Sequence, residues 1–550
     1  MAPRSLRRYS AACGRVDNSE GMSLLAVALT VAMGVFGCAH TPKVEAAGPA
    51  GQITKGPCLL RVGRDRVALM WETDTKGPWR VSYGREDYPR SAQEETASVT
   101  SVLQEGWKTA YIQKIWITDL QPGRTYSYRI VGPGTQSDVY EFHTVPAKTD
   151  EVRFIVYGDS RTQPAIHRRL AEQMMKHDVD FIVNSGDLVL RGGDHAQWGP
   201  QFFEPLKGLM ERIPIYIAKG NHEGNDGLYE KMLVPPGEGG NFGIDYGPLH
   251  YFCADNVSAG TDAGGLVLRM ARDARESKAL WKFVGYHVPS VDFGGHWSAW
   301  RQADVLPAFA GAGIDFVMTG HSHEYERFRP VEPPGEGNYV TYMVAGGGGA
   351  PLYEVEPTTY HAYARAVYHF CLFHIQGEVL TMDAIDPNGR TFDHIEIKKN
   401  DGRLNGEYTA TAVPLGSVLL RQALHGSLNA ALSSRPQENR PCTLNINLAV
   451  PPLGGETKLT FWLRGPENYQ LPERHTITVG EKGEPVRVEL TFTPKLAVQP
   501  AQSTLGKTAP IESPLWAYCL YEFGGFEDIV AWPVKAKERS LLEWITGTGN

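Results

Sequence analysis

The sequence lacks the patterns that mark several common protein classes. Only seven of its 550 residues are cysteines, and no two are spaced as CxxC, so neither a disulfide scaffold nor a zinc ribbon is indicated. The 54 basic residues are outnumbered by 62 acidic ones, so no basic surplus exists to displace counterions from nucleic-acid phosphates. No GxSxG segment occurs near a suitable histidine, which leaves serine-type hydrolysis with little support.

The composition is that of a folded protein with several domains. Apolar residues make up 42% of the chain, aromatic residues 10% and charged residues 21%, which excludes a mostly disordered or polytopic membrane protein. The 59 glycines and 37 prolines favour a turn-rich, strand-containing chain. Because 550 residues exceed what one hydrophobic core serves, we expect two to four domains.

The amino terminus is typical of a targeting segment. Arginines within residues 1–22 precede an uncharged apolar run of 15 residues, Ser23–Gly37, which is shorter than the roughly 20 residues of a spanning helix. The run ends at Cys38 and resembles the lipobox of bacterial lipoproteins. We expect a signal peptide over 1–37, a lipidated Cys38 and a tether over 38–53, hence a cell-envelope lipoprotein or secreted protein. An ordinary signal or an uncleaved anchor is the alternative.

Residues 54–147 read as a β-sandwich. Alternating β-branched and aromatic runs follow one another, separated by regular turn signals. The stretch Leu120–Tyr126 (LQPGRTY) resembles the fibronectin type III pattern, with Tyr126 as the corner tyrosine whose hydroxyl bonds back to the backbone. Trp71 is expected in the core, and no chemistry is expected in this region.

Two further regions follow. Residues 150–398 alternate short apolar strands with helical stretches such as Gln163–His177, which predicts an α/β domain with a largely parallel or mixed sheet. Residues 405–545 again read as β, and we assign this C-terminal region no function. Cys442 and Cys519 in it could form a disulfide or remain buried thiols, with equal weight.

The chemistry-bearing residues follow five apolar runs of the α/β region. Since the groups beyond the carboxyl ends of strands in α/β sheets meet in one crevice, the five clusters are expected to converge. Their oxygen and nitrogen donors, without any thiolate, suit Zn, Mn, Fe or Mg. The runs and their clusters are Phe154–Asp159 (GDSR), Phe181–Asp187 (GDLVL), Ile215–Glu223 (GNHE), Phe283–His287 and Phe316–His323 (GHSH).

The number of donors exceeds what one tetrahedral ion uses, which points to two ions sharing a carboxylate. Two such ions can clamp a phosphoryl oxygen, generate hydroxide near neutral pH and offset the charge of an in-line displacement. A glycine precedes the Asp or Asn in these clusters and lets the backbone turn sharply out of the strand. Each motif alone is weak; the five together, in this order, carry the prediction.

The series resembles the calcineurin-like metallophosphoesterases, most closely the purple acid phosphatase branch. The resemblance covers residues from about 54 to 398, because that branch also has a fibronectin-like domain ahead of its catalytic domain. Besides the five clusters, it rests on Val284–His287 (VGYH), on GHSHEYER at 320–327 and on the glycine run Val344–Pro351, interpreted as a tight bend near the site.

The resemblance implies a role for each matching residue. Asp187 would bridge the ions, Asp159 and His323 would bind one of them, and the other ion would be held by Asn221, His287 and His321. His222 would stand near the leaving group or phosphate, and His296 would contact substrate and act as an acid.

Two positions depart from the family. Where the branch has a metal-binding tyrosine the chain has Leu190, and where other members have a histidine it has Arg161, so the first metal site loses a usual fourth ligand. We interpret Arg161 as a phosphate-binding residue, with a salt bridge to a nearby carboxylate as an equal alternative. His167 could replace the missing ligand, but a solvent-facing histidine at the start of a helix is favoured.

The prediction as a whole is an α/β (α+β) metallophosphoesterase sandwich with mixed sheets, between a fibronectin type III-like β-sandwich and a β-rich C-terminal domain. It would hold two divalent or trivalent ions (Fe, Zn or Mn) and hydrolyse a small phosphomonoester by attack of metal-bound hydroxide. A phosphodiesterase or nucleotidase is the alternative in the same class, and a non-catalytic surface binding protein is the alternative outside it. No nucleic-acid partner is expected, and membrane contact only through Cys38.

Overall fold

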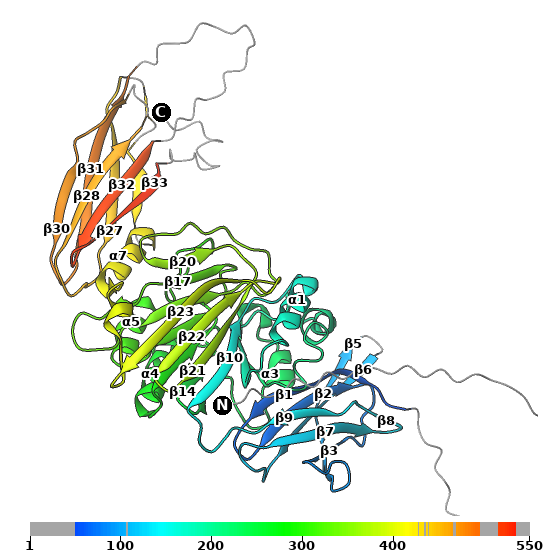
Figure 1. Ribbon diagram of the computed structural model, residues 1–550. Coiled ribbons are helices and arrows are strands. Elements are labelled where there is room, and N and C mark those ends of the chain that lie inside the picture. Colours follow the sequence, from blue (N-terminus) through cyan, green and yellow to red (C-terminus); the bar gives the residue numbers. More distant parts are fainter. Residues whose placement is uncertain are drawn as a thin grey trace, which may run out of the picture. The chain divides into compact units, whose positions relative to one another are not determined.

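The computed structural model describes residues 50–105, 108–426, 428–433, 436–437, 439–465, 469–495 and 515–534 (Figure 1). The expected signal peptide, Cys38 and most of the tether lie outside these residues. Within the described part of the chain, no helix is long and apolar enough to cross a membrane.

The first region is a β-sandwich. One sheet has the order β1(Ile53–Val62)-β2(Val67–Thr73)-β6(Lys108–Ile117)-β5(Ser98–Glu105), and the other contains β4(Gln93–Thr96), β3(Arg80–Gly84), β7(Thr125–Gly132), β8(Thr135–Gln136) and β9(Tyr140–His143). Trp71 and Tyr126 lie in its core, and the Tyr126 hydroxyl accepts the Gln121 N–H at 2.9 Å. The expected core tryptophan and corner tyrosine are confirmed.

The central region consists of two seven-stranded mixed sheets. The first has the order β12(Ile215–Ile217)-β11(Phe181–Asn184)-β10(Glu151–Tyr157)-β21(Phe370–Gln376)-β22(Val379–Ile385)-β23(Thr391–Asn400)-β24(Arg403–Leu404). The second has the order β13(Phe242–Tyr246)-β14(Leu249–Cys253)-β15(Trp281–Gly285)-β16(Phe316–Thr319)-β19(Thr341–Ala345)-β17(Tyr325–Phe328)-β20(His361–Arg365). The mixed pairing confirms the predicted fold class.

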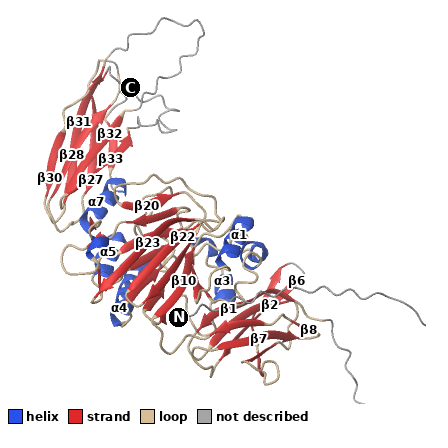
Figure 2. Ribbon diagram, viewed as in Figure 1, coloured by secondary structure: helices blue, strands red, loops and turns tan. Residues whose placement is uncertain are grey.

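An aromatic core joins the two sheets face to face. The Phe154 ring of β10 lies 5.5 Å from the Phe283 ring of β15 and 4.9 Å from Phe373 of β21. Alternation along β10 sends Phe154 inward, while Ile155 and Tyr157 face the opposite side, where they pack with residues of α1(Pro164–Met174). Helices α4(Ala263–Glu276) and α5(Gln302–Ala310) pack on the second sheet (Figure 2).

Parallel pairing brings the chemistry to one edge of each sheet. Strands β10, β11 and β12 run parallel, and so do β15 and β16, so their carboxyl ends fall together within each sheet. The other short α-helices in this region are α2(His195–Trp198) and α3(Leu228–Leu233), and 3-10 helices cover Asn221–Glu223 and Gly260–Asp262. The five predicted clusters stand in the loops that follow these five strands.

The C-terminal region starts with the short helix α6(Gly406–Thr409), followed by β25(Val413–Pro414) and α7(Leu415–Gly426). Strand β25 pairs with β18(Val331–Glu332) of the central region. It then forms two four-stranded sheets, which agrees with the predicted β-rich texture. One has the order β26(Asn429–Leu432)-β27(Cys442–Ala449)-β31(Pro485–Pro494)-β29(Tyr469–Gln470), and the other β30(His475–Val479)-β28(Thr457–Arg464)-β32(Trp516–Phe523)-β33(Phe526–Pro533). Cys442 and Cys519 are buried and not disulfide-bonded.

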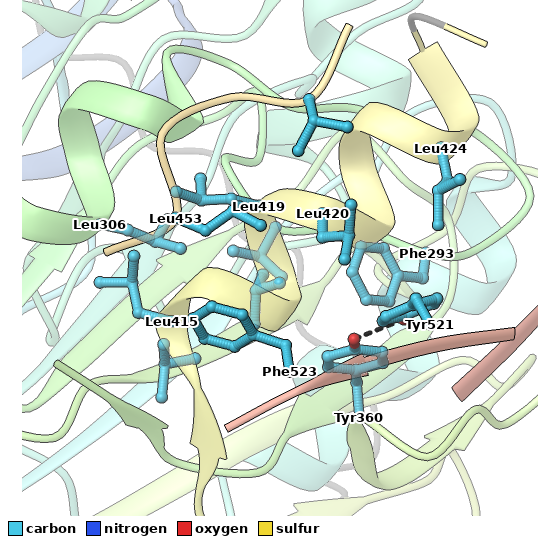
Figure 3. Packing of buried hydrophobic residues seen from close by; sticks show 14 of the residues in the cluster. Phe293, Leu306, Tyr360, Leu415, Leu419, Leu420, Leu424, Leu453, Tyr521 and Phe523 are labelled. Carbon is cyan, nitrogen blue, oxygen red and sulfur yellow. Dashed lines mark hydrogen bonds between the residues drawn. The ribbon is translucent and has the colours of Figure 1, made fainter. Parts of the chain in front are cut away.

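One apolar cluster runs from the second sheet into the C-terminal region. Figure 3 shows Phe293 and Tyr360 of the central region against the leucines of α7, with Tyr360 hydrogen-bonded to Tyr521 of β32. The Trp297 ring stacks on His425 of α7, with ring centres 3.7 Å apart. The loop that carries His296 therefore packs directly on the C-terminal region.

Candidate metal centre

Three of the expected ligands have a backbone conformation that non-glycine residues rarely adopt. Asp159 after β10, Asp187 after β11 and His321 after β16 have φ values of 56°, 58° and 69°. Such residues cost on the order of 1–3 kcal/mol each and persist only where their surroundings hold them. Here the neighbouring loops do so: the Asp159 N–H donates to Gly186 O at 2.9 Å, and the His321 N–H donates to Asp159 Oδ2 at 2.8 Å.

Glycines of the clusters are needed for close approach. A Cβ on Gly220 would lie 2.3 Å from Asp187 Oδ1, and one on Gly320 would lie 2.4 Å from Asp159 Oδ2. The glycine run after β19 lies against the same place, since the Gly348 N–H donates to Gly158 O at 2.8 Å. Any side chain at these positions would collide with the ligand carboxylates or their loops.

Four donors converge on what we call the second side of the centre, formed by Asn221, His287 and His321 together with Asp187. His287 Nε2 lies 3.0 Å from Asn221 Oδ1, 3.2 Å from His321 Nδ1 and 3.3 Å from Asp187 Oδ1. Its other nitrogen, Nδ1, donates to Ser185 O at 2.7 Å, so Nε2 carries a lone pair toward the other donors.

Burial keeps the second-side imidazoles neutral. It lowers the pKa of His287, and burial, with the nearby His287 and His296 imidazoles, lowers the pKa of His321 to about 3. Neutral imidazole is the form that binds a cation. The donor set of two nitrogens, an amide oxygen and a carboxylate therefore fits a metal ion.

The first side of the centre is formed by Asp159 and His323, again with Asp187. His323 Nδ1 donates to Pro351 O at 2.8 Å, so Nε2 faces inward, 3.7 Å from Asp159 Oδ1. Burial lowers the pKa of His323 to about 4. Asp159 Oδ1 is buried without a hydrogen-bond partner, and burial, with the charge of Asp187, raises the Asp159 pKa. An orphaned carboxylate oxygen beside an inward lone pair fits a cation.

Arg161 lies on the first side. Its Nε donates to Asp187 Oδ2 at 3.3 Å, and its Nη2 donates to His323 Nε2 at 3.2 Å. Its side chain is 10% exposed. Of the two interpretations of Arg161, the salt bridge to a carboxylate is present; contact with a phosphate stays a prediction.

Leu190 and His167 supply no ligand. The Leu190 side chain is exposed, and its carbonyl accepts from His222 Nδ1 at 2.7 Å. The favoured expectation of a solvent-facing His167 is wrong. It is fully buried on the face of α1 that also carries Leu170, and its two nitrogens contact Tyr157 Oη and Gln201 O, both at 3.0 Å. The i, i+3 spacing from His167 to Leu170 could have placed it on the buried face.

The two histidines expected to act on substrate border the centre. His222 Nε2 lies 3.7 Å from Asp187 Oδ2, and the backbone N–H of His222 donates to Asp187 Oδ1 at 2.9 Å. The His296 ring lies 4.5 Å from the His321 ring. Both lie next to ligands without being part of the donor set.

Two residues near the centre were missed from the sequence. Tyr353 stacks on His323 with ring centres 4.3 Å apart and lies 5.4 Å from His296. Glu223, the last residue of GNHE, is buried and accepts the Asp187 N–H at 2.9 Å and the Gly220 N–H at 2.7 Å. A glutamate three residues after the turn glycine is a local signal for such a clamp, whereas nothing local marks Tyr353.

A group of three buried carboxyls comes from the loops that carry His296 and His323 and from the adjoining strand β17. Ligand atoms of Asp292, Glu324 and Glu326 lie within 4.8 Å of one another. Burial, with the charge of Asp292, raises the Glu324 pKa to about 8, and the pKa values of the other two are raised as well. Protonation therefore limits the charge of this group at neutral pH.

Comparison with known proteins agrees with this geometry. Residues 60–144 match the purple acid phosphatase N-terminal domain, and residues 137–325 match the calcineurin-like phosphoesterase family. Purple acid phosphatase 21 of Arabidopsis thaliana is 26% identical over 316 residues, which cover 52% of this chain and 69% of that protein. The probable inactive purple acid phosphatase 1 of the same plant is 24% identical over 375 residues, 55% of this chain and 58% of that protein.

A solved structure shares the fold. Purple acid phosphatase PPD1 from yellow lupin (Lupinus luteus) seeds superimposes with a TM-score of 0.53 at 19% identity, covering 66% of this chain and 77% of that one. The fold and the donor set both suit a dinuclear metal centre. Residues 137–325 thus form a calcineurin-like phosphoesterase domain behind a purple acid phosphatase N-terminal domain, and the chain is related to the purple acid phosphatases.

Proposed function

We propose that the protein is a phosphomonoesterase that works outside the cytoplasm with two metal ions drawn from Fe, Zn and Mn. The observation that carries the proposal is the convergence of neutral imidazole lone pairs and carboxylate oxygens from five strand ends, with Asp159 Oδ1 buried and unpartnered. Without a cation this arrangement is costly, because a buried polar atom without a partner loses its hydration uncompensated.

The proposed ligand roles follow the two sides of the centre. Asn221, His287 and His321 would hold one ion on the second side, and Asp159 and His323 would hold the other on the first side. Asp187 would serve both, because its Oδ1 faces His287 on the second side and its Oδ2 faces Arg161 on the first side. When bound, such ions supply Lewis acidity that activates water and offsets the charge of the phosphoryl oxygens. Glu223 fixes the Asp187 backbone, and thus orients its carboxylate toward both sides.

His222 and His296 are the proposed proton donors to the leaving oxygen. His222 is held by the Leu190 carbonyl through Nδ1, which leaves Nε2 directed toward the centre, 3.7 Å from Asp187 Oδ2. His296 stands on the opposite loop, beside His321 and Tyr353. An imidazole in contact with substrate can deliver a proton near neutral pH.

Hydrolysis of p-nitrophenyl phosphate tests the proposal. The full chain, stripped of metal, is titrated with Mn, Fe or Zn beside Asp187→Asn. We expect metal-dependent turnover that the variant loses. No turnover with any metal, with this monoester or with bis(p-nitrophenyl) phosphate, would refute a catalytic role. Turnover of the diester alone would favour the phosphodiesterase alternative.

A non-catalytic surface protein is the second candidate. Arg161 and Leu190 replace family ligands, and two matched relatives from Arabidopsis thaliana are themselves named probable inactive purple acid phosphatases 1 and 24. Against it, the six other ligand positions all carry donors that converge, and three of these residues have positive φ values. Two equivalents of bound metal with no turnover of either ester would support this candidate.

The proposed location rests on the amino terminus. The basic segment, the apolar run Ser23–Gly37 and Cys38 support export with lipid attachment. Expression in a bacterium supplied with labelled palmitate tests it: label that Cys38→Ser abolishes supports the lipoprotein, whereas an unlabelled, secreted chain supports an ordinary signal peptide.

A further inference from the structure

Arg161 takes up hydrogen-bond acceptors that a first-side ion needs. Asp187 Oδ2 accepts from the Arg161 Nε at 3.3 Å, and His323 Nε2 accepts from its Nη2 at 3.2 Å. His323 has no other nitrogen to offer, because its Nδ1 already donates to Pro351 O. Asp187 Oδ1 faces His287 on the second side and accepts the backbone N–H of His222. One guanidinium therefore occupies two of the lone pairs that face the first side.

A guanidinium in this position competes with a metal ion. Arginine stays positively charged at every physiological pH and has donors only. A metal ion could bind Asp187 Oδ2 and His323 Nε2 only after both hydrogen bonds are broken and the second positive charge is moved away. The Arg161 backbone is itself fixed, since its N–H donates to Asp187 O at 3.2 Å, so the side chain must swing out alone.

The second side has no such competitor. Among the described residues, no lysine or arginine nitrogen lies within hydrogen-bond or ion-pair distance of Asn221, His287 or His321. Their donor atoms lie within 3.2 Å of one another. An ion there displaces no positively charged group. The asymmetry between the sides thus depends on one residue.

We propose that the two metal positions are unequal, because Arg161 acts as a built-in competitor for the first-side ion. The protein retains one ion tightly on the second side, and the first side fills only at higher metal concentration, as the guanidinium leaves Asp187 and His323. This inference rests on the proposed function in that it assumes metal binding by these ligands, but it concerns affinity and makes no claim about turnover.

Titration of the full, metal-stripped chain with Mn²⁺, followed by electron paramagnetic resonance without substrate, tests the inference. For the natural chain we expect two separate binding steps, and a spin-coupled manganese pair only in the second. Arg161→Met removes the charge and keeps much of the side-chain volume. It should tighten the second step by about ten- to hundredfold, the equivalent of the charged hydrogen bonds that no longer have to be broken, and leave the first step unchanged.

Two control variants secure the interpretation. Arg168→Ala removes a positive charge from the partly exposed surface of α1, where Arg168 pairs with Glu172 at 3.1 Å, and should leave both steps as they are. His287→Ala should remove the tight step and so assign it to the second side. If Arg161→Met fails to fold, the natural chain alone still decides: two equally tight ions overturn the inference.

The failures are distinguishable. Two tight steps in both the natural chain and Arg161→Met contradict the competition but leave the metallophosphoesterase intact. An Arg168→Ala effect as large as that of Arg161→Met would reduce the result to net charge and overturn the inference. Absence of any manganese binding would contradict the proposed function and the inference together.

Discussion

The two sides of the centre share the Asp187 carboxylate and differ in what surrounds it. On the second side, burial holds His287 and His321 neutral, and their lone pairs face Asn221 and each other. On the first side, His323 is prepared in the same way, through its bond to Pro351 O, but its lone pair faces a guanidinium. The difference teaches that a suitable ligand geometry does not by itself give a high metal affinity, since one neighbouring cation can lower the affinity and leave the geometry unchanged.

The largest expected effect comes from the residue that both sides share. Asp187→Asn leaves the amide with only one acceptor oxygen and removes the charge that both ions need. Residues that merely orient a ligand cost 10- to 100-fold when removed, so we expect a loss of more than about 100-fold in kcat with p-nitrophenyl phosphate. Metal content after dialysis should fall to near zero. A variant that keeps both ions would contradict the bridging role.

Removing one histidine from each side should change metal retention by different amounts. His287→Ala is expected to lose the ion that survives dialysis, whereas His323→Ala is expected to keep it, because the first side contributes little to retention while Arg161 is present. Metal content per chain, measured after dialysis at a fixed low manganese concentration, checks this. Equal losses in the two variants would mean that the sides are equivalent.

The stability of the fold next to the first side should fall at low pH. His167 Nδ1 donates to Gln201 O, so its Nε2 accepts from the Tyr157 hydroxyl. The Gln201 side chain accepts the Leu190 N–H at 2.9 Å, three residues after Asp187. Burial lowers the His167 pKa from 6.5 to about 4. Below pH 6.5 the unfolded chain therefore binds a proton that the folded chain does not, so stability falls as the pH drops toward 4.

Urea unfolding of the metal-free chain between pH 7 and pH 4.5 measures this loss. It should reach on the order of 3 kcal/mol for His167 if the shift is fully expressed. His167→Gln should flatten the pH slope. An identical slope in the natural chain and the variant would show that His167 does not hold its proton differently on folding.

The smallest expected effect comes from the C-terminal region. His425→Ala removes the ring on which Trp297 stacks and loosens the loop of His296 without touching a ligand. An aromatic pair of this kind contributes about 0.5–1.5 kcal/mol, so we expect a two- to tenfold loss in kcat, with metal content unchanged. A matching loss of metal would instead show that the loop supports the ligands.

The parts of this centre that depend on short sequence motifs could be predicted from the sequence. Apolar runs that end in Gly-Asp or Gly-Asn reveal strands and the turns after them, and the parallel pairing of β10, β11 and β12 brings those turns together. The fold class is confirmed on this basis. The ligand roles of the six residues stay predictions, because they depend on ions and not on the fold alone.

What the sequence could not supply depends on distant contacts. Arg161 and His323 are separated by 162 positions, and no local pattern indicates that the guanidinium meets that imidazole. The stacking of Tyr353 on His323 and of Trp297 on His425 likewise requires the tertiary fold. His167 is a different case: a position near the start of a helix does not tell which face the side chain occupies, and α1 buries the face that carries His167 and Leu170.

The most direct measurement is anomalous diffraction at the manganese edge from crystals equilibrated at low and at high Mn²⁺. At low metal, the account predicts one full peak between Asn221, His287 and His321, with Arg161 between Asp187 and His323. At high metal, it predicts a second peak beside Asp159 and His323, with Arg161 turned away. Two full peaks already at low metal would contradict it.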